Sequence, residues 1–119
     1  MTTPIPTDIQ LHQKSRILEI AFEDGRRYRL PCEYLRVFSP SAEVKGHGPG
    51  QEILQVGKEE VTITEILPVG NYGIRPRFSD GHDTGIYTWE YLYELGIRHQ
   101  ELWAEYVQRL EHAGRPRRG

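Results

Sequence analysis

The stretch Asp80–Asp83 combines one histidine with two carboxylates, and it is the part of the sequence with the strongest signs of chemistry. An imidazole beside carboxylates can bind a divalent metal ion or act as a general base, because histidine titrates near neutral pH. His82 and Asp83 are therefore candidate ligands for iron or another divalent metal, with His47 as a third candidate that only the fold could bring close. A tight turn also requires Asp and Gly for backbone reasons, so a purely structural turn accounts for the same residues.

Two further segments contain residues with reactive or phosphate-binding potential, and neither forms a recognised motif. The glycine-rich loop Gly46–Gly50 lacks the lysine and the serine or threonine of a P-loop, so we expect a surface loop there. Cys32 has no base close in sequence and is expected to be a buried apolar residue rather than a nucleophile. The sequence contains no nucleophile elbow, no His-Glu-x-x-His and no Cys-x-x-Cys. We therefore expect that the protein is not an enzyme.

Composition is typical of an ordinary globular domain. Of the 119 residues, 37% are hydrophobic and 27% are charged. The net charge of -2 argues against a nucleic-acid partner, which would require a basic surface. The single cysteine excludes an intramolecular disulfide and any all-cysteine metal site. No apolar run approaches the roughly 18 residues of a spanning helix, and polar residues and prolines follow Met1. We therefore expect no membrane association and a cytoplasmic location.

One domain is expected over residues 1–119, because this length is too short for two ordinary domains. We expect its core at about 9–95, a C-terminal helix at about 98–113 and a basic tail at 114–119.

Alternation of apolar and polar residues predicts β-hairpins in the first half of the chain. Residues 1–8 carry two prolines and no periodicity, which indicates an extended or frayed lead-in. Asp24 and Gly25 form a strong hairpin signal, because glycine tolerates the positive φ of such turns. Pro31 suits the first turn of a short helix, and residues 39–50 are too rich in Ser, Pro and Gly for a regular element. The expected strands are 9–12, 16–22 and 28–30, and the expected helix is 31–36.

The second half repeats the hairpin pattern and ends in helices. Pro76 within the second strand of this half indicates an edge or a bulged strand. Thr88 is a plausible helix N-cap and Gly96 a plausible stop. The expected strands are 61–67, 74–78 and 86–87. Apolar residues at helical spacing predict one packed stripe on the last helix. These residues are Leu102, Trp103, Tyr106, Val107 and Leu110.

An internal similarity links the two halves. The pattern Phe-x-Asp-Gly occurs at Phe22–Gly25 and again at Phe78–Gly81, and Glu-Tyr-Leu follows at Glu33–Leu35 and at Glu90–Leu92. The second spacing is one residue longer. The match is either a duplicated unit or a chance recurrence of a common turn. Both interpretations predict an α+β fold of small antiparallel β-hairpin sheets, with two strand–turn–strand–short helix units and C-terminal helices.

Longer motifs resemble one known family. They are Leu-Arg-Val-Phe-Ser-Pro-Ser-Ala-Glu-Val at 35–44, Gly-His-Gly-Pro-Gly at 46–50, Gly-Asn-Tyr at 70–72, and Phe-Ser-Asp-Gly-His-Asp-Thr-Gly-Ile-Tyr-Thr-Trp at 78–89. From these motifs the chain is similar, over about residues 9–95, to a bacterial stand-alone member of the gamma-butyrobetaine hydroxylase-like N-terminal domain family. The resemblance implies a small α+β module of undefined function. Such a module precedes the catalytic domain of hydroxylases and is appended to some scaffold ATPases of iron–sulfur cluster assembly.

The resemblance also bears on metal binding. In the hydroxylases the module holds a structural zinc through Leu-Arg-x-x-Cys-x-Cys-x-x-Cys and the histidine of a later Asp-x-His turn. The three cysteine positions correspond here to Ser39, Ser41 and Val44, and the histidine corresponds to His82. Serine is a poor zinc ligand at neutral pH and valine is none. The comparison therefore implies no zinc and no cofactor, with iron as the alternative.

These observations lead to two main hypotheses of function. A small enzyme is the third and least favoured, because no nucleophile and base occur together in the sequence. The first is a non-catalytic accessory module that binds a protein partner, in iron–sulfur cluster or iron-enzyme maturation, as the resemblance implies. The second is a protein that binds iron or another divalent metal through His82, Asp83 and His47. The residues expected to contact the partner are Arg36, Ser39, Ser41, Glu43, His47, Asp80, His82 and Asp83.

Overall fold

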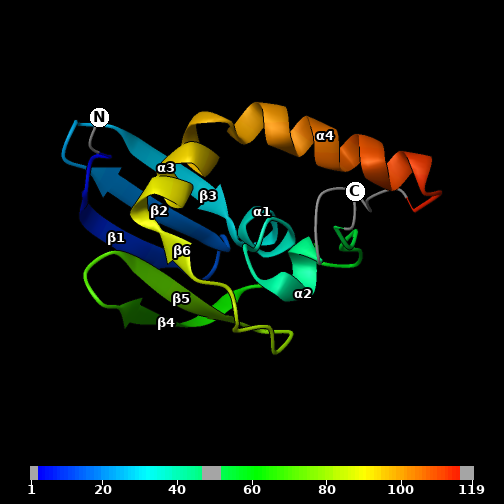
Figure 1. Cartoon of the computed structure of the whole chain (residues 1–119), viewed down its shortest axis with the longest axis horizontal. Helices are drawn as coiled ribbons and strands as arrows, with labels where there is room; N and C mark the ends of the chain where they lie inside the picture. Colours follow the sequence, from blue (N-terminus) through cyan, green and yellow to red (C-terminus); the bar gives the residue numbers. More distant parts are fainter. Residues whose placement is uncertain (1–2, 47–51, 116–119) are drawn as a thin grey trace.

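The computed structural model describes residues 3–46 and 52–115, and this part of the chain has an α+β fold (Figure 1). The first antiparallel sheet has the order β1-β2-β3, with β1 at Pro6–His12, β2 at Ile17–Phe22 and β3 at Arg27–Pro31. The second has the order β4-β5-β6, with β4 at Ile63–Val69, β5 at Gly73–Phe78 and β6 at Tyr87–Thr88. The helices are α1 at Cys32–Val37, α2 at Ala42–Lys45, α3 at Trp89–Ile97 and α4 at His99–His112.

The core lies between the two sheets and the helices α1 and α3. Leu18, Ile20 and Phe22 share the inward face of β2 and are at most 2% exposed, as the alternation predicts. Leu35 of α1 and Leu92 of α3 are fully buried in the same cluster. Each such side chain contributes about 1.5–3 kcal/mol relative to an exposed one. This burial fixes α1 against the sheets, and α1 in turn determines where the segment after it begins.

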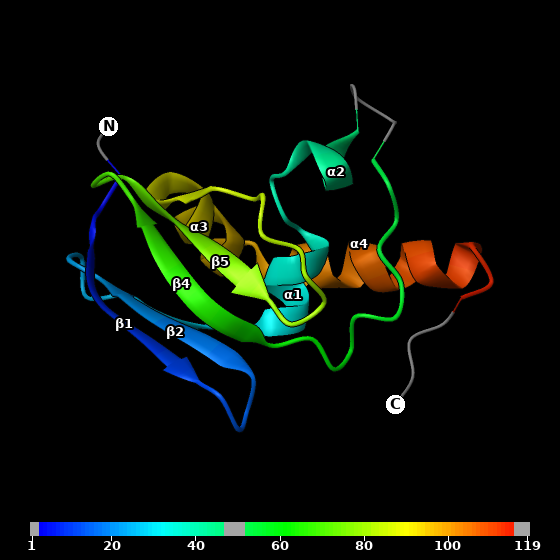
Figure 2. The same cartoon turned by 90° about the horizontal axis from the view of Figure 1, so that it is seen from below.

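Tyrosine hydroxyls attach α1 and the segment after it to the second half of the chain. Tyr34 Oη donates to the carbonyl of Leu95 at 2.7 Å, and Tyr87 Oη donates to the carbonyl of Leu35. Tyr91 Oη donates to the carbonyl of Phe38 at 2.6 Å. A buried carbonyl without a partner would be costly, so these bonds favour one position of α1. In both views α4 extends away from the sheets past α1 (Figures 1 and 2).

The predicted similarity of the two Asp-Gly turns is confirmed in the hydrogen bonds. Gly25 and Gly81 have φ of +89° and +91°, and each donates its N–H at 3.0 Å to the phenylalanine three residues earlier. Each aspartate accepts the backbone N–H two residues later, from Arg26 at 3.0 Å and from His82 at 3.2 Å. Glycine is required at both positions because other residues are strained at this φ.

Four details differ from the sequence-based expectations. α3 continues through Gly96, the expected stop, and ends at Ile97. The lead-in joins the first sheet at Pro6, because its backbone pairs with β2. The expectation of no regular element at 39–50 is wrong, since Ser41 caps the short helix α2. Pro76 lies in the central strand β5, not at an edge. It is tolerated there because β6 pairs only with Gly73 and Ile74, which leaves one side of β5 unpaired at Pro76.

The C-terminal helix forms as predicted and buries Tyr106 and Leu110 against Val37. In the described part of the chain no helix combines the length and apolarity of a membrane span. The glycine-rich loop lies outside the described residues beyond Gly46, and so does His47. The end of the basic tail, 116–119, also lies outside them.

Candidate functional site

Two segments that are distant in sequence meet beside α1 and form a hydrogen-bonded network, which we call the Ser39–His82 cluster. The first segment links α1 to α2 and carries Ser39 and Ser41. The second follows the second Asp-Gly turn and carries His82 and Thr84. Ser39 Oγ lies 2.8 Å from His82 Nε2, and Ser41 Oγ lies 2.7 Å from Thr84 Oγ1. The two segments are thereby tied together through side chains alone.

The local sequence explains why these segments can approach so closely. Ser41 accepts the N–H of Glu43 at 3.1 Å as the N-cap of α2, and its own N–H donates to Ser39 Oγ at 3.2 Å. A Cβ atom at Gly85 would lie only 2.4 Å from Ser39 Oγ. Glycine at this position is therefore needed for the contact between the two segments.

His82 is a buried imidazole, with a side chain only 4% exposed. Burial lowers its pKa, and the charge of Arg36 lowers it further, so the ring is neutral at pH 7. Glu43 Oε2 lies 3.9 Å from His82 Nδ1 and opposes this effect. The Glu43 carboxylate also accepts a hydrogen bond from the Thr84 hydroxyl, which lowers the pKa of Glu43. The order serine, histidine, glutamate resembles a hydrolytic triad, but Ser39 is fully buried and cannot meet a substrate in this state.

Asp80 lies next to the cluster, in the turn that precedes His82. Its Oδ2 accepts from Arg36 Nε at 2.9 Å and from Lys58 Nζ at 2.7 Å. Partial burial raises the pKa of Asp80, but the bonds from Lys58, the His82 backbone N–H and Arg36 outweigh it, and the pKa falls to about 2. Arg36 Nη1 is buried and has no hydrogen-bond partner among the described residues. Asp80 is therefore the group that compensates the buried charge of Arg36.

Asp83 does not join this network. Its Oδ2 lies 3.8 Å from both Arg75 Nη1 and Arg77 Nε, and its side chain is 37% exposed. His82 instead directs its Nε2 to Ser39. The two described members of the hypothetical metal site thus have different partners, and the third, His47, lies outside the described residues.

The cluster brings together most of the residues that the sequence suggested. Arg36, Ser39, Ser41 and His82 are each less than 9% exposed. They therefore support the surface from beneath and offer little area for contact with a partner. Glu43, with a side chain 63% exposed, and Asp83 remain available for contact. Thr84 and Lys58 are not among the residues that the sequence suggested. Thr84 adjoins the suspected turn, but nothing in the sequence indicates that Lys58 reaches Asp80.

Three of the four positions that the family resemblance implies as zinc ligands lie in this network. Ser39, Ser41 and His82 belong to one network, and Val44 is buried at 7% exposure. Two hydroxyls, one aliphatic side chain and one imidazole do not fit a zinc ion, which takes thiolate, imidazole or carboxylate ligands. Over residues 3–46 and 52–115, no three His, Cys, Asp or Glu side chains are grouped so as to hold a metal. Hydrogen bonds link Ser39, Ser41 and His82, which the resemblance implies as zinc-ligand positions.

Solved structures similar to this chain support the fold. Two NMR solution structures are 46% and 48% identical to it, with TM-scores of 0.84 and 0.83. Their alignments cover 98% of this chain and 91% and 90% of the solved chains, respectively. A crystal structure from Acidithiobacillus ferrooxidans ATCC 23270, described as a protein of unknown function of the DUF971 family, is 43% identical with a TM-score of 0.65. That alignment covers 76% of this chain and 91% of the solved one.

No curated protein matches the chain significantly. The model of one protein family, described as gamma-butyrobetaine hydroxylase-like, N-terminal, matches residues 9–93. This segment includes both sheets except the start of β1, together with the Ser39–His82 cluster and the first part of α3, and it ends before α4. The chain therefore belongs to the gamma-butyrobetaine hydroxylase-like N-terminal domain family.

Proposed function

We propose that this protein is a non-catalytic accessory module of the cytoplasm that docks a protein partner in iron–sulfur cluster or iron-enzyme maturation. The observation that carries the proposal is the closed state of the Ser39–His82 cluster. Its hydroxyls and its imidazole bond to one another, and Ser39 is fully buried. A nucleophile and a base must reach the substrate to act, so this arrangement favours a structural role. The maturation pathway itself rests on the family resemblance.

The exposed groups around the cluster define the proposed contact surface. Glu43 and Asp83 present carboxylates, and Arg36, Ser39 and Ser41 hold the backbone beneath them. Carboxylates at an interface favour a partner with a basic contact surface. We expect charge reversal at Glu43 or Asp83 to weaken docking without unfolding the domain, because both side chains are at least 37% exposed.

Affinity purification from the native host tests this proposal. The wild-type protein is expected to recover a maturation factor or an iron enzyme, identified by mass spectrometry, and Glu43→Lys is expected to lose it. Glu111→Lys is the matched control, because it makes the same charge change at an exposed position of α4. If Glu43→Lys and Asp83→Lys retain every partner that the wild type binds, the proposed contact surface is wrong.

Metal analysis separates the alternative hypothesis from this proposal. Protein purified without a histidine tag is expected to contain no stoichiometric iron or other divalent metal. A stoichiometric metal that is lost in His82→Ala would instead support the metal-binding hypothesis. The result decides between the two hypotheses because docking through Glu43 and Asp83 requires no bound metal.

A further inference from the structure

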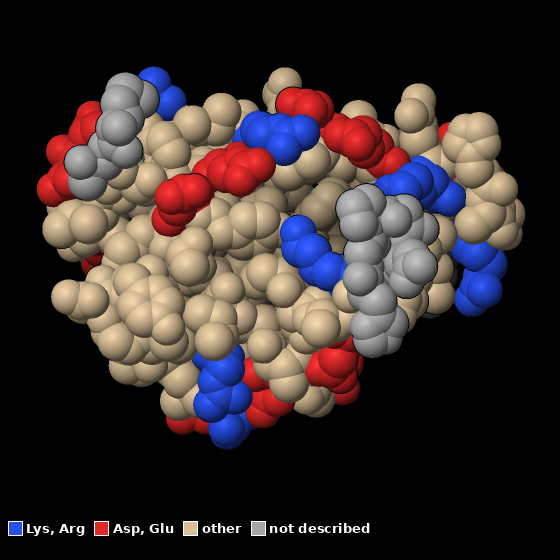
Figure 3. Space-filling view, in the orientation of Figure 1, with Lys and Arg blue, Asp and Glu red and all other residues tan. Residues whose placement is uncertain are grey.

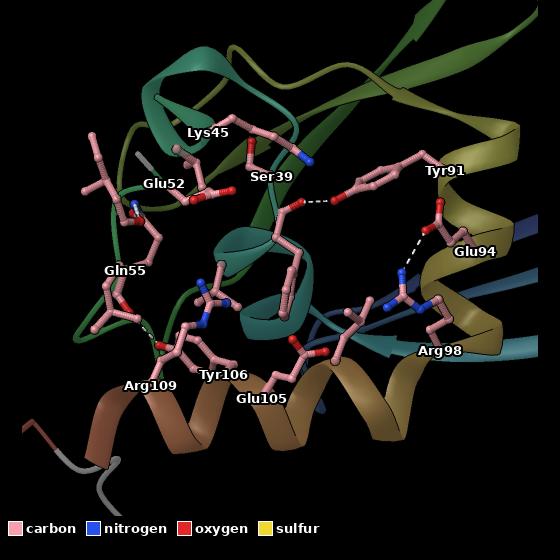
Figure 4. Close-up of a pocket in the computed structure, with 16 residues that line it drawn as sticks. Ser39, Lys45, Glu52, Gln55, Tyr91, Glu94, Arg98, Glu105, Tyr106 and Arg109 are labelled. Atoms are coloured by element: carbon pink, nitrogen blue, oxygen red, sulfur yellow. Dashed lines mark hydrogen bonds and ion pairs between the residues drawn. The ribbon is translucent and has the colours of Figure 1, made fainter. Parts of the chain in front are cut away.

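Two hollows border α4. The larger, of about 330 Å³, lies between α3, α4, the segment that links α1 to α2, and residues 52–55 (Figure 4). Figure 3 shows charged side chains of both signs around its mouth. The exposed cations Lys45 and Arg109 lie on opposite sides of it. The exposed anions Glu52 and Glu105 also lie on opposite sides. This hollow therefore does not select one ligand chemistry.

The smaller hollow, of about 240 Å³, lies where the beginnings of α1 and α4 meet. The described residues that line it are Pro31, Glu33, His99 and Trp103. His99 and Trp103 are four residues apart, so they lie on one stripe of α4. Both lie beyond residue 93, where the family match ends. The volume suits a single side chain, because small-molecule sites usually exceed about 300 Å³.

A buried tyrosine fixes the rings that line this smaller hollow. Tyr34 is fully buried in α1 and stacks on His99, with the ring centroids 4.3 Å apart and an interplanar angle of 22°. It also meets the Trp103 ring edge to face, with the centroids 6.2 Å apart. The rings of His99 and Trp103 are thus held in place before a ligand binds, which reduces the entropy cost of binding.

Glu33 supplies the charge of the smaller hollow. The residue is only 7% exposed, and it is one of the residues that line the hollow. A carboxylate has two oxygens with about four acceptor positions, so Glu33 can accept from a ligand in addition to its contacts within the protein. Burial lowers the pKa of His99, so this ring is neutral at pH 7. The described lining therefore carries one negative charge and no positive one.

We propose that the smaller hollow receives an arginine side chain of the protein partner. The guanidinium N–H groups donate to the Glu33 carboxylate, and the guanidinium plane stacks on the Trp103 indole. A lysine ammonium also pairs with the carboxylate but has no plane to stack, so arginine is preferred. Glu33 repels an anionic side chain and forms no charge-assisted hydrogen bond with an apolar one. This proposal rests on the proposed function and adds a second contact to that of Glu43 and Asp83.

A titration followed by ¹H–¹⁵N NMR tests the proposal with three matched probes. Nα-acetyl-L-arginine amide presents the guanidinium group. Nα-acetyl-L-citrulline amide has nearly the same shape without the charge, and Nα-acetyl-L-lysine amide has the charge without the plane. The arginine probe is expected to shift the indole N–H signal of Trp103, one of the two tryptophans of the chain. The citrulline probe is expected to bind about tenfold more weakly, and the lysine probe to bind between the two.

Three results of this titration would overturn the proposal. The arginine probe may leave the Trp103 signal unchanged up to its solubility limit, which would exclude the site. Equal binding of the arginine and citrulline probes would exclude the pairing with Glu33. Equal binding of the arginine and lysine probes would exclude the stacking on Trp103. The comparison uses the wild-type protein, so it decides even where a variant unfolds.

Variants test the two contacts separately. Glu33→Gln is expected to weaken binding of the arginine probe about tenfold and to abolish its advantage over the citrulline probe. Trp103→Leu is expected to abolish its advantage over the lysine probe, measured from the amide signal of His99. Glu111→Gln, on α4 but outside the hollow, is the control and is expected to bind all three probes as the wild type does. Unchanged binding in both Glu33→Gln and Trp103→Leu would show that the probe binds elsewhere.

Affinity purification separates this proposal from the proposed function. Glu33→Gln is expected to recover less of the partner than Glu111→Gln does. If the wild type recovers a partner but the arginine probe leaves the Trp103 signal unchanged, the arginine contact is wrong and the proposed function stands. If the probe binds as expected but no partner is recovered, a protein partner is the wrong source of the guanidinium group, and the proposed function is wrong with it.

Discussion

At Asp24–Gly25 and at Asp80–Gly81 the backbone makes the same turn, with the same two hydrogen bonds and nearly the same glycine φ. The aspartates differ in what surrounds them. Asp24 accepts the Tyr93 hydroxyl at an exposed position. Asp80 accepts Arg36 and Lys58, and Arg36 is buried. A common local signal thus specifies the turn in both places, while the tertiary surroundings decide whether its carboxylate accepts a neutral hydroxyl or neutralises a buried charge.

The chain also continues differently after each turn. β3 begins at Arg27, immediately after the first turn, whereas β6 begins only at Tyr87. The segment between the second turn and β6 is not part of a strand, and it places His82 and Thr84 beside the serines of the α1–α2 segment. In the first unit the residue after the glycine is Arg26, an exposed residue, in the place that His82 occupies in the second. The candidate site therefore depends on the residues that separate the second turn from β6, because they supply His82 and Thr84.

The largest effect is expected from Asp80→Ala compared with Asp24→Ala. Loss of the Asp80 carboxylate leaves the buried Arg36 without its counter-charge, which costs about 3 kcal/mol of unfolding free energy. Asp24→Ala removes only exposed contacts and is expected to cost clearly less. Urea unfolding of the two variants measures the difference. Equal losses of unfolding free energy would mean that the two aspartates stabilise the protein through their turns and not through the different side chains around them.

A somewhat smaller effect is expected at Gly85. Gly85→Ala places a Cβ 2.4 Å from Ser39 Oγ and is expected to cost about 2 kcal/mol. Removal of the hydroxyl in the double variant Ser39→Ala/Gly85→Ala is expected to recover about 1 kcal/mol of this loss, relative to the sum of the single variants. Arg29, four residues after Gly25 as Gly85 is after Gly81, is exposed, and Arg29→Ala is the control. Strict additivity of the two substitutions would show that the segments do not meet through this contact.

The two turn glycines are expected to behave alike. A Cβ atom at Gly25 or Gly81 would meet nothing within 4 Å, so only the positive φ opposes alanine. Gly25→Ala and Gly81→Ala are each expected to cost about 1–2 kcal/mol. Thermal or urea unfolding of both variants provides the measurement. A much larger loss of unfolding free energy in Gly81→Ala than in Gly25→Ala would indicate that contacts outside the second turn, and not only its own hydrogen bonds, hold it in place.

The sequence predicts the local structure well because hairpins and helix caps are local. Alternation identifies the buried face of β2, and Thr88 caps α3 as expected by accepting the N–H of Tyr91 at 3.1 Å. α2 is missed because four residues are too few for a periodic pattern, and its only sign is Ser41 followed by Glu43. Short elements of this kind depend on their caps and on tertiary contacts more than on propensity.

The site could be predicted only in part. Ser39 and His82 are 43 residues apart, and their contact depends on how α1 and β5 pack, which residue spacing does not reveal. The family resemblance links Ser39, Ser41 and His82, because it implies that all three correspond to ligand positions. Lys58 could not be predicted, since a lone lysine between two strands carries no sign of its partner.

The smallest expected effect concerns the pH dependence of stability. His82 in the second turn contributes to it near neutral pH, whereas Arg26, at the same place in the first turn, does not. The pKa of His82 is lower in the folded protein than the ordinary value of 6.5, because the ring is buried and lies near Arg36 and Lys58, while Glu43 and Asp80 only partly offset this. As the pH falls from 7.5 to 5, the unfolded chain takes up a proton that the folded state does not. Stability should therefore decrease over this range.

His82→Gln removes this titration and keeps an amide that can bond Ser39, so its stability is expected to vary less between pH 7.5 and about 5. Burial also lowers the pKa of His99, so part of the slope is expected to persist in this variant and to disappear when His99→Gln is added. Below about pH 4 both proteins should lose stability again, because the unfolded chain then takes up a proton at Asp80, whereas in the folded protein the pKa of Asp80 is only about 2. Urea midpoints measured at each pH test these expectations. An identical slope in the wild type and in His82→Gln would mean that the second turn, like the first, contributes no titrating group near neutral pH.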